Sequence, residues 1–178
     1  MSIWTIPTSA SAARRSHAAG PVSPARPGVE VEFQTMLVPV NTADRDLPGD
    51  VIEVAVQLAG ERRAWLVVLA FTEIPLGEEM DMDIEGLDEC VERLAAGARA
   101  IGEQYGIRVH TTHLRTRDAA ETILAEAARL ESQLILLRTP ARLDRTGRRQ
   151  VAYSHVVRRI VADATQRVMV VRPQAVRA

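Results

Sequence analysis

The sequence predicts a Rossmann-like α/β fold in which five parallel strands form a doubly wound sheet with helices on both faces. Short apolar segments alternate along the chain with longer segments whose apolar residues recur at helical spacing. The short segments contain almost no polar residues, which is typical of strands that are buried on both faces. The chain has 178 residues, of which 47% are hydrophobic, and this suits one domain with a sizeable core.

The first half of the domain supplies two expected strands and two expected helices. Met36–Val40 is a continuous apolar run, and Pro39 is tolerable near its end, where no ladder donor is needed. A helix is expected over about 48–60, with proline at its start and glycine at its end. Residues 65–71 form the second strand, and apolar residues at helical spacing predict a helix over about 84–105.

The second half repeats the same alternation. A third strand is expected over 107–114, followed by a helix that runs to about residue 131. Asp118 and Glu121 resemble a capping box at the start of this helix. Residues 134–137 and 168–171 are the last two strands, and a helix at about 153–164 lies between them. The alternation predicts a parallel sheet with right-handed crossovers.

The ordered domain is expected to span residues 33–173. Residues 1–32 are rich in Ala, Ser, Pro and Gly and lack sustained periodicity, so we interpret them as a disordered leader or linker. Residues 174–178 are interpreted as a short tail.

Composition excludes several classes of chemistry and partner. All 22 basic residues are arginine, which removes a catalytic lysine, a P-loop lysine and the lysine of a response-regulator receiver. A near-neutral charge of −1 and 3% aromatic residues argue against a nucleic-acid partner. With one cysteine and no apolar run of membrane-spanning length, we expect a cytoplasmic protein without internal disulfides or membrane insertion.

The ordered segment resembles the universal stress protein family over about residues 33–172. Met36–Asn41 is similar to the opening strand of that family, and 118–124 to the helix start after its third strand. Residues 133–137 and 157–172 are similar to its fourth strand and its closing helix and strand. The resemblance implies the adenine nucleotide alpha hydrolase-like strand order 3-2-1-4-5 and a homodimer paired through Arg167–Arg172. It also implies a regulatory role, and some relatives are tails of membrane transporters, so a transporter is one expected class of partner.

Nucleotide-binding members of that family carry a glycine-rich phosphate loop after the fourth strand. Here Arg138 and Ala141 occupy the first two glycine positions, so our first hypothesis is an interaction module with a degenerate nucleotide site, no catalytic centre, no cofactor and no metal. The second hypothesis is a protein that binds ATP, AMP or a cyclic dinucleotide, or a weak ATPase. Its binding site at the switch point between strands 1 and 4 would use the following residues: Asn41, Thr42, Arg138, Thr139, Arg142, Ser154 and His155.

Two segments carry opposite charge. Residues 138–159 contain seven arginines against one aspartate, which suits either an anionic ligand or a solvated loop. Residues 73–89 contain eight carboxylates and no basic residue, which is favourable near a helix N-terminus. We also considered a hard cation at residues 80–83 and pairing of the acidic segment with the arginine-rich one.

Overall fold

The computed structural model describes residues 34–44, 47–139 and 148–172, apart from the side chains of Arg62 and of residues 148–154. Over these residues, strands and helices alternate as expected. The elements are β1 (Thr35–Asn41), the 3-10 turn η1 (Thr42–Asp44), α1 (Gly49–Arg62), β2 (Trp65–Glu73), α2 (Leu87–Gln104), β3 (Val109–Thr116), α3 (Ala119–Arg129), β4 (Leu134–Arg138), α4 (Arg148–Asp163) and β5 (Arg167–Val171).

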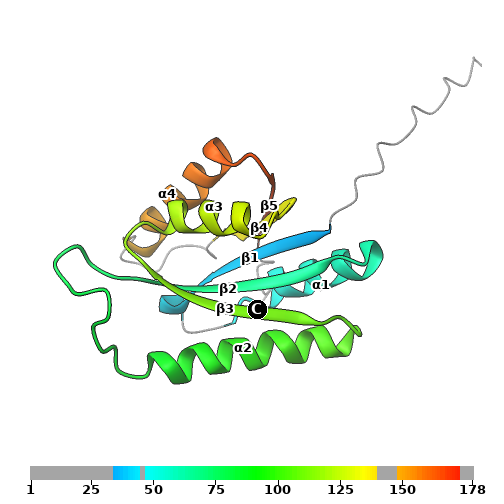
Figure 1. Cartoon of the computed structure of the whole chain (residues 1–178), viewed down its shortest axis with the longest axis horizontal. Coiled ribbons are helices and arrows are strands. Elements are labelled where there is room, and N and C mark those ends of the chain that lie inside the picture. Colours follow the sequence, from blue (N-terminus) through cyan, green and yellow to red (C-terminus); the bar gives the residue numbers. More distant parts are fainter. Residues whose placement is uncertain (1–33, 45–46, 140–147, 173–178) are drawn as a thin grey trace, which may run out of the picture. The chain divides into compact units, whose positions relative to one another are not determined.

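The strands form one parallel sheet in the order β3-β2-β1-β4-β5 (Figure 1). β1 lies at the centre, where Met36 is opposite Leu66 of β2 on one side and Leu134 of β4 on the other. This confirms the predicted fold and strand order. In this order the connections that follow β1 and β4 leave toward opposite faces, which creates a crevice at the carboxyl ends of the strands.

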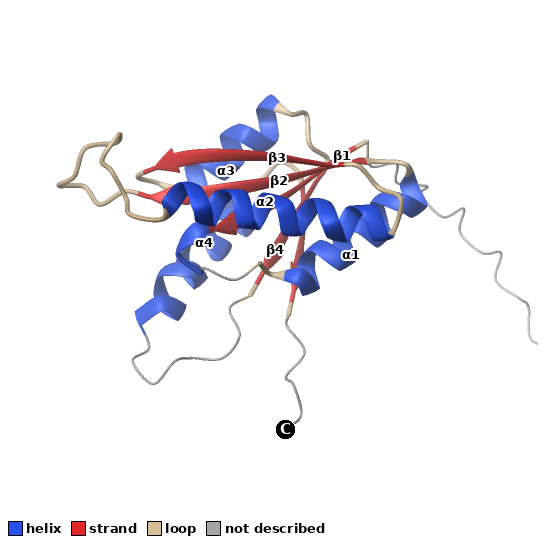
Figure 2. Ribbon diagram, turned by 90° about the horizontal axis from the view of Figure 1, so that it is seen from below, coloured by secondary structure: helices blue, strands red, loops and turns tan. Residues whose placement is uncertain are grey.

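Helices cover both faces of the sheet, which is why the strands are apolar throughout. α1 and α2 pack on one face, while α3 and α4 pack on the other (Figure 2). In β1, Met36, Val38 and Val40 contribute to the core beneath α1 and α2, whereas Leu37 contributes to the core beneath α3 and α4. The side-chain period of two therefore divides each central strand between two cores.

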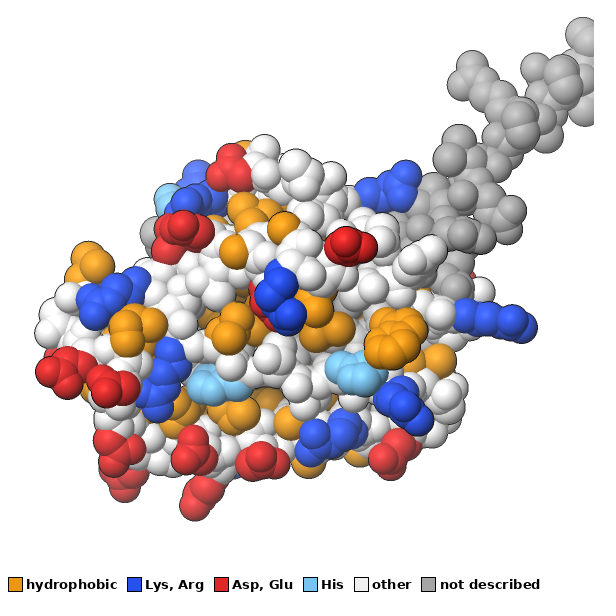
Figure 3. Space-filling view, in the orientation of Figure 1, with side chains coloured by type: hydrophobic (Ala, Val, Ile, Leu, Met, Phe, Trp, Pro, Cys, Tyr) orange, Lys and Arg blue, Asp and Glu red, His pale blue; other side chains and the backbone are white. Residues whose placement is uncertain are grey.

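The acidic segment between β2 and α2 is held by two arginines at the end of β3. Arg115 donates hydrogen bonds to the carbonyl oxygens of Met80 and Met82, and Arg117 donates one to that of Leu76. These bonds use backbone oxygens, so the carboxylates stay exposed at this end of the molecule (Figure 3). The predicted pairing with the arginine-rich segment falls largely outside the described residues.

The starts of three elements differ from the prediction by two residues or more. α2 begins at Leu87 rather than at residue 84, because Gly86 precedes it with a left-handed φ of 72°. β3 begins at Val109, and Ile107 instead packs its side chain against the core beneath α1 and α2. α4 begins at Arg148, about one turn earlier than expected.

The end of α1 also differs from the prediction. The helix passes Gly60 and ends at Arg62, and Arg63 adopts the left-handed conformation with φ 55°. The Arg63 N–H donates to the carbonyl oxygen of Ala59, which closes the last turn. Gly60 therefore lies within the helix and does not end it.

Asp118 joins the two helices on one face of the sheet. It is the N-cap of α3, where its Oδ1 accepts a hydrogen bond from Glu121 N–H at 3.0 Å. The same carboxylate forms an ion pair with Arg159 of α4. The predicted capping box is only half present, because the Asp118 N–H donates to Thr116 Oγ1 at 2.9 Å. The Glu121 hydrogen bond, followed by Arg159, lowers the pKa of Asp118.

We predict that Asp118→Ala lowers the free energy of unfolding by about 1–2 kcal/mol, because the N-cap of α3 is lost. Because the pKa of Asp118 is lower in the folded state, its stabilising effect is complete above the unfolded pKa of about 3.9. It disappears as pH falls through the folded pKa. Urea unfolding at pH 7 and at pH 3 measures both effects.

The matched control is Asp81→Ala, an exposed carboxylate in the acidic segment. It should change the free energy of unfolding by less than about 0.5 kcal/mol. Equal effects of the two substitutions at pH 7 would contradict the role given to Asp118.

Candidate functional site

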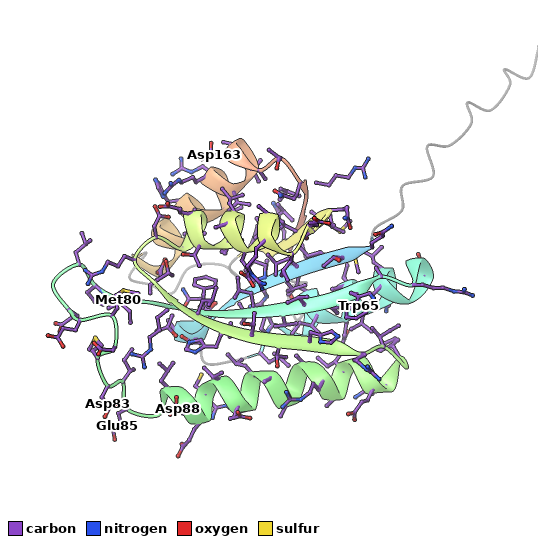
Figure 4. All side chains as sticks on the ribbon, in the orientation of Figure 1. Trp65, Met80, Asp83, Glu85, Asp88 and Asp163 are labelled. Atoms are coloured by element: carbon purple, nitrogen blue, oxygen red, sulfur yellow. The ribbon has the colours of Figure 1, made fainter. Side chains whose placement is uncertain are left out.

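A cleft of about 630 Å³ lies at the carboxyl ends of β1 and β2, beside the N-terminus of α2. It lies at the carboxyl edge of the sheet, but on the side of β1 that faces β2 and not at the predicted switch point between β1 and β4. Glu85 and Asp88 mark this end of α2 in Figure 4. The cleft is lined by Asn41, Thr42, Ala43, Thr72, Glu73, Ile84, Glu85, Gly86, Leu87, Cys90 and Arg93.

Asn41 ends β1 and shapes the turn that borders the cleft. Its Oδ1 accepts a hydrogen bond from Ala43 N–H at 2.9 Å, which is the geometry of an Asx turn. The Nδ2 amide has no hydrogen-bond partner among the residues that the structure describes. Asn41 therefore offers two N–H donors to a ligand, while its oxygen stabilises the turn.

Buried hydroxyl groups connect the wall of the cleft to His113 on β3. The Oγ1 atoms of Thr42 and Thr72 lie 2.8 Å apart, and Thr72 Oγ1 lies 2.9 Å from His113 Nε2. Thr42 Oγ1 also donates to the carbonyl oxygen of Phe71 at 3.3 Å. Each hydroxyl thus has a partner, which fixes both threonine side chains in position.

The electrostatic environment of the cleft is mixed. Burial, and then the nearby charge of Asp118, raises the pKa of Glu73. Glu85 adds a second carboxylate and Arg93 a guanidinium. Burial also lowers the pKa of His113, so its imidazole is neutral at pH 7. The cleft therefore offers hydroxyl and amide groups and one guanidinium, beside two carboxylates.

Arg138 and Thr139 of the predicted site lie at the end of β4. Arg138 forms an ion pair with Asp50 of α1, whose Oδ1 is 2.9 Å from Arg138 Nε. The Thr139 N–H and hydroxyl both donate to the carbonyl oxygen of Val171, at 2.9 and 3.4 Å. Both side chains therefore have partners within the fold, and neither lines the cleft described above.

The remaining predicted site residues are Arg142, Ser154 and His155. Arg142 and the Ser154 side chain lie outside the described residues. His155 is exposed on α4. Asn41 and Thr42 are thus the predicted residues that the structure brings together in one cleft, and the proposed roles of all seven stay predictions.

Nine of the eleven lining residues were not among the predicted site residues, and they include Thr72, Glu73, Cys90 and Arg93. Thr72 and Glu73 end β2, and Cys90 and Arg93 lie in the first turns of α2. In the sequence, Thr72 and Glu73 form a polar pair at the end of an apolar strand, and this pattern could have identified both residues. Cys90 is buried, and its thiol lies 3.6 Å from the Thr42 carbonyl oxygen, so the prediction that it packs is consistent with the structure.

Among the described residues, His, Cys, Asp and Glu side chains form no group of three or more that could hold a metal ion. None of the described helices has the length and apolarity needed to cross a membrane.

Several solved structures share this fold. A universal stress protein in complex with cAMP matches with a TM-score of 0.58 and 14% identity, over 80% of this chain and 98% of its own. One from Archaeoglobus fulgidus in complex with dAMP has a TM-score of 0.54 and 18% identity, over 79% and 98% of the two chains. An Arabidopsis thaliana family protein with AMP bound has a TM-score of 0.56 and 13% identity, over 80% and 93%. At such low identities, these TM-scores above 0.5 show a common fold.

A comparison with curated proteins found no match. The sequence model of the universal stress protein family matches residues 32–172, which is most of the chain and includes every strand and helix described above. This chain therefore belongs to the universal stress protein family.

Proposed function

We propose that this domain is a non-catalytic regulatory module that acts through protein contacts, and that two copies pair through β5. The observation that supports this proposal is the exposed apolar surface around β5. Met169 and Val170 on the strand are 37% and 42% exposed, and Val161 on the adjoining α4 is 54% exposed. Large apolar side chains at such exposure on an edge strand favour a protein partner.

The position of β5 in the sheet strengthens this interpretation. β5 pairs with β4 on one side and lies at the edge of the described sheet on the other. An edge strand presents backbone N–H and C=O groups to any strand placed beside it. A second copy of β5 would satisfy these groups and cover the apolar side chains on both copies, as expected for a symmetric dimer.

The arrangement of polar groups supports regulation more than turnover. Arg138, at a position where nucleotide-binding relatives have glycine, is held by Asp50 instead of extending into the cleft. Thr72 shares its hydroxyl between Thr42 and His113, so it is fixed by the fold on both sides. We infer that these groups stabilise the end of the sheet and that the output is a contact with another protein.

We predict that the full-length chain is a dimer at micromolar concentration and that Val170→Glu makes it a monomer. A carboxylate at this position would place like charges close together across the proposed two-fold axis. Sedimentation velocity over a concentration series measures the change. The matched control is Leu76→Glu, which alters a side chain that is 86% exposed on the acidic segment.

The control should remain a dimer with the sedimentation coefficient of the unmodified chain. Monomeric unmodified protein at micromolar concentration would contradict the proposal. A dimer that survives Val170→Glu would show that another surface joins the two copies.

A second candidate function is binding of an adenine mononucleotide in the cleft. The cleft volume, the free amide donors of Asn41 and the Arg93 guanidinium favour it. Relatives of the same fold bind cAMP, dAMP and AMP. In this interpretation the nucleoside occupies the end of β1 and β2, with Asn41 donating to its ring or ribose.

We predict that AMP raises the thermal unfolding temperature by several degrees at 100 times its Kd, since such binding stabilises the folded state by about 2.7 kcal/mol. Asn41→Ala should weaken AMP binding at least tenfold. Gln57→Ala, which removes an exposed amide on α1, should leave binding unchanged. If AMP, ATP, cAMP and cyclic dinucleotides all fail to stabilise the protein at low and moderate salt, this second function is eliminated.

A further inference from the structure

A second, smaller cavity lies between α2 and the sheet beneath it. Its volume is about 170 Å³, and it shares no lining residue with the cleft at the strand ends. It opens between α2 and the edge strand β3. The cavity is lined by Val40, Val68, Ala70, Val91, Glu92, Leu94, Ala95, Arg99, Thr111, Thr112 and His113.

Local side-chain size explains why the cavity exists. Near the end of α2, Gly102 lets the helix approach the sheet closely, since a Cβ there would lie 2.5 Å from the Ile107 carbonyl oxygen. Farther toward the N-terminus, the helix lines the cavity with the small side chain of Ala95, and the sheet lines it with Ala70. Two alanines cannot fill the space between the layers, so a cavity remains.

The floor of the cavity is apolar and is formed by buried residues of the core. Val40, Val68 and Leu94 are only 2%, 3% and 2% exposed, and Ala70 is 6% exposed. An apolar cavity of about 150 Å³ is large enough to bind a molecule the size of benzene. This floor therefore suits a compact apolar group.

The mouth of the cavity is polar and carries one cation, Arg99. Arg99 Nη1 donates to Thr111 Oγ1 at 3.3 Å, which holds the guanidinium across the gap between α2 and β3. This bond uses one of five N–H donors, so the others can meet a carboxylate. Glu92 lies seven residues earlier on the helix, about 10.5 Å from Arg99 along its axis.

His113 forms the third side of the mouth and is neutral at pH 7. Burial, and then the charge of Arg115, lowers its pKa, while Asp88 acts in the opposite direction. Its Nε2 is hydrogen-bonded to Thr72. Arg99 is therefore the cation at the mouth of the cavity. Glu92 is the anion, and it lies at the other end of the mouth along α2.

We propose that this cavity is a binding site for a compact apolar monocarboxylate of about the size of benzoate. The apolar end lies against Val40, Val68 and Leu94, and the carboxylate meets Arg99. The site is separate from the cleft at the strand ends and from β5. His113 nevertheless connects this cavity to the wall of the cleft through hydrogen bonds with Thr72 and, beyond it, Thr42. A ligand in the cavity is therefore placed to affect both threonine side chains.

The test is a titration of the full-length, 15N-labelled protein with sodium benzoate, followed by two-dimensional NMR. We expect saturable shifts of backbone amides in residues 91–99 and 111–113. Ala95→Leu, which fills the cavity, should weaken binding at least tenfold. Ala96→Leu introduces the same side chain at the next, exposed position of α2 and should change the Kd less than twofold.

The charge of the ligand is tested separately. Arg99→Gln, at an exposed position that should not affect folding, is expected to weaken benzoate binding at least fivefold. Benzylamine, with the same ring and the opposite charge, should bind at least tenfold more weakly than benzoate. Arg108→Gln, at an exposed position outside the cavity, is the control.

Several outcomes would overturn the proposal. Absence of saturable shifts in these segments would eliminate the site. Benzoate affinity unchanged by Ala95→Leu would place the ligand elsewhere. Tighter binding of benzylamine than of benzoate would contradict the role of Arg99 and therefore the proposed class of ligand.

Discussion

The structure depends on one constraint, which is that helices cover both faces of the five-stranded sheet. Every central strand must then be apolar on both sides, and buried backbone groups must be paired within the sheet. Polar side chains therefore gather at the carboxyl ends of the strands, and unpaired backbone groups remain at the edges of the sheet. The cleft at Asn41 and Glu73 and the exposed strand β5 are both consequences of this arrangement.

The two edges of the sheet differ in a way that bears on function. At the β3 edge, Arg115 and Arg117 hold the acidic segment in place through its backbone carbonyls. This edge strand also carries polar side chains, and its His110 stacks at a centroid distance of 5.0 Å on Trp65 of β2, which is 63% exposed. At the other edge, Met169 and Val170 are exposed without such cover from the described residues. The chemistry of the edges therefore favours β5 as the surface for a second copy.

Most of the fold could be predicted because local patterns and tertiary structure agree. The apolar runs became strands, and Asp118 caps α3 as its sequence position suggests. The site was less predictable, because its contacts join residues far apart in sequence. Thr72 meets His113 across 41 residues, and Arg138 meets Asp50 across 88. The spacing of apolar residues along the chain cannot reveal such long-range pairs. Asn41 and Thr42 were therefore predicted from the sequence, whereas Thr72 and Glu73 were not.

We propose that two copies of the chain meet at β5. Hydrogen–deuterium exchange of the full-length protein, measured over a series of protein concentrations, tests it most directly. The account predicts that protection of backbone amides in Arg167–Val171 rises with concentration, while protection of Val109–Thr116 on the opposite edge stays constant. Exchange of β5 that does not depend on concentration, or new protection at β3 instead, would contradict it.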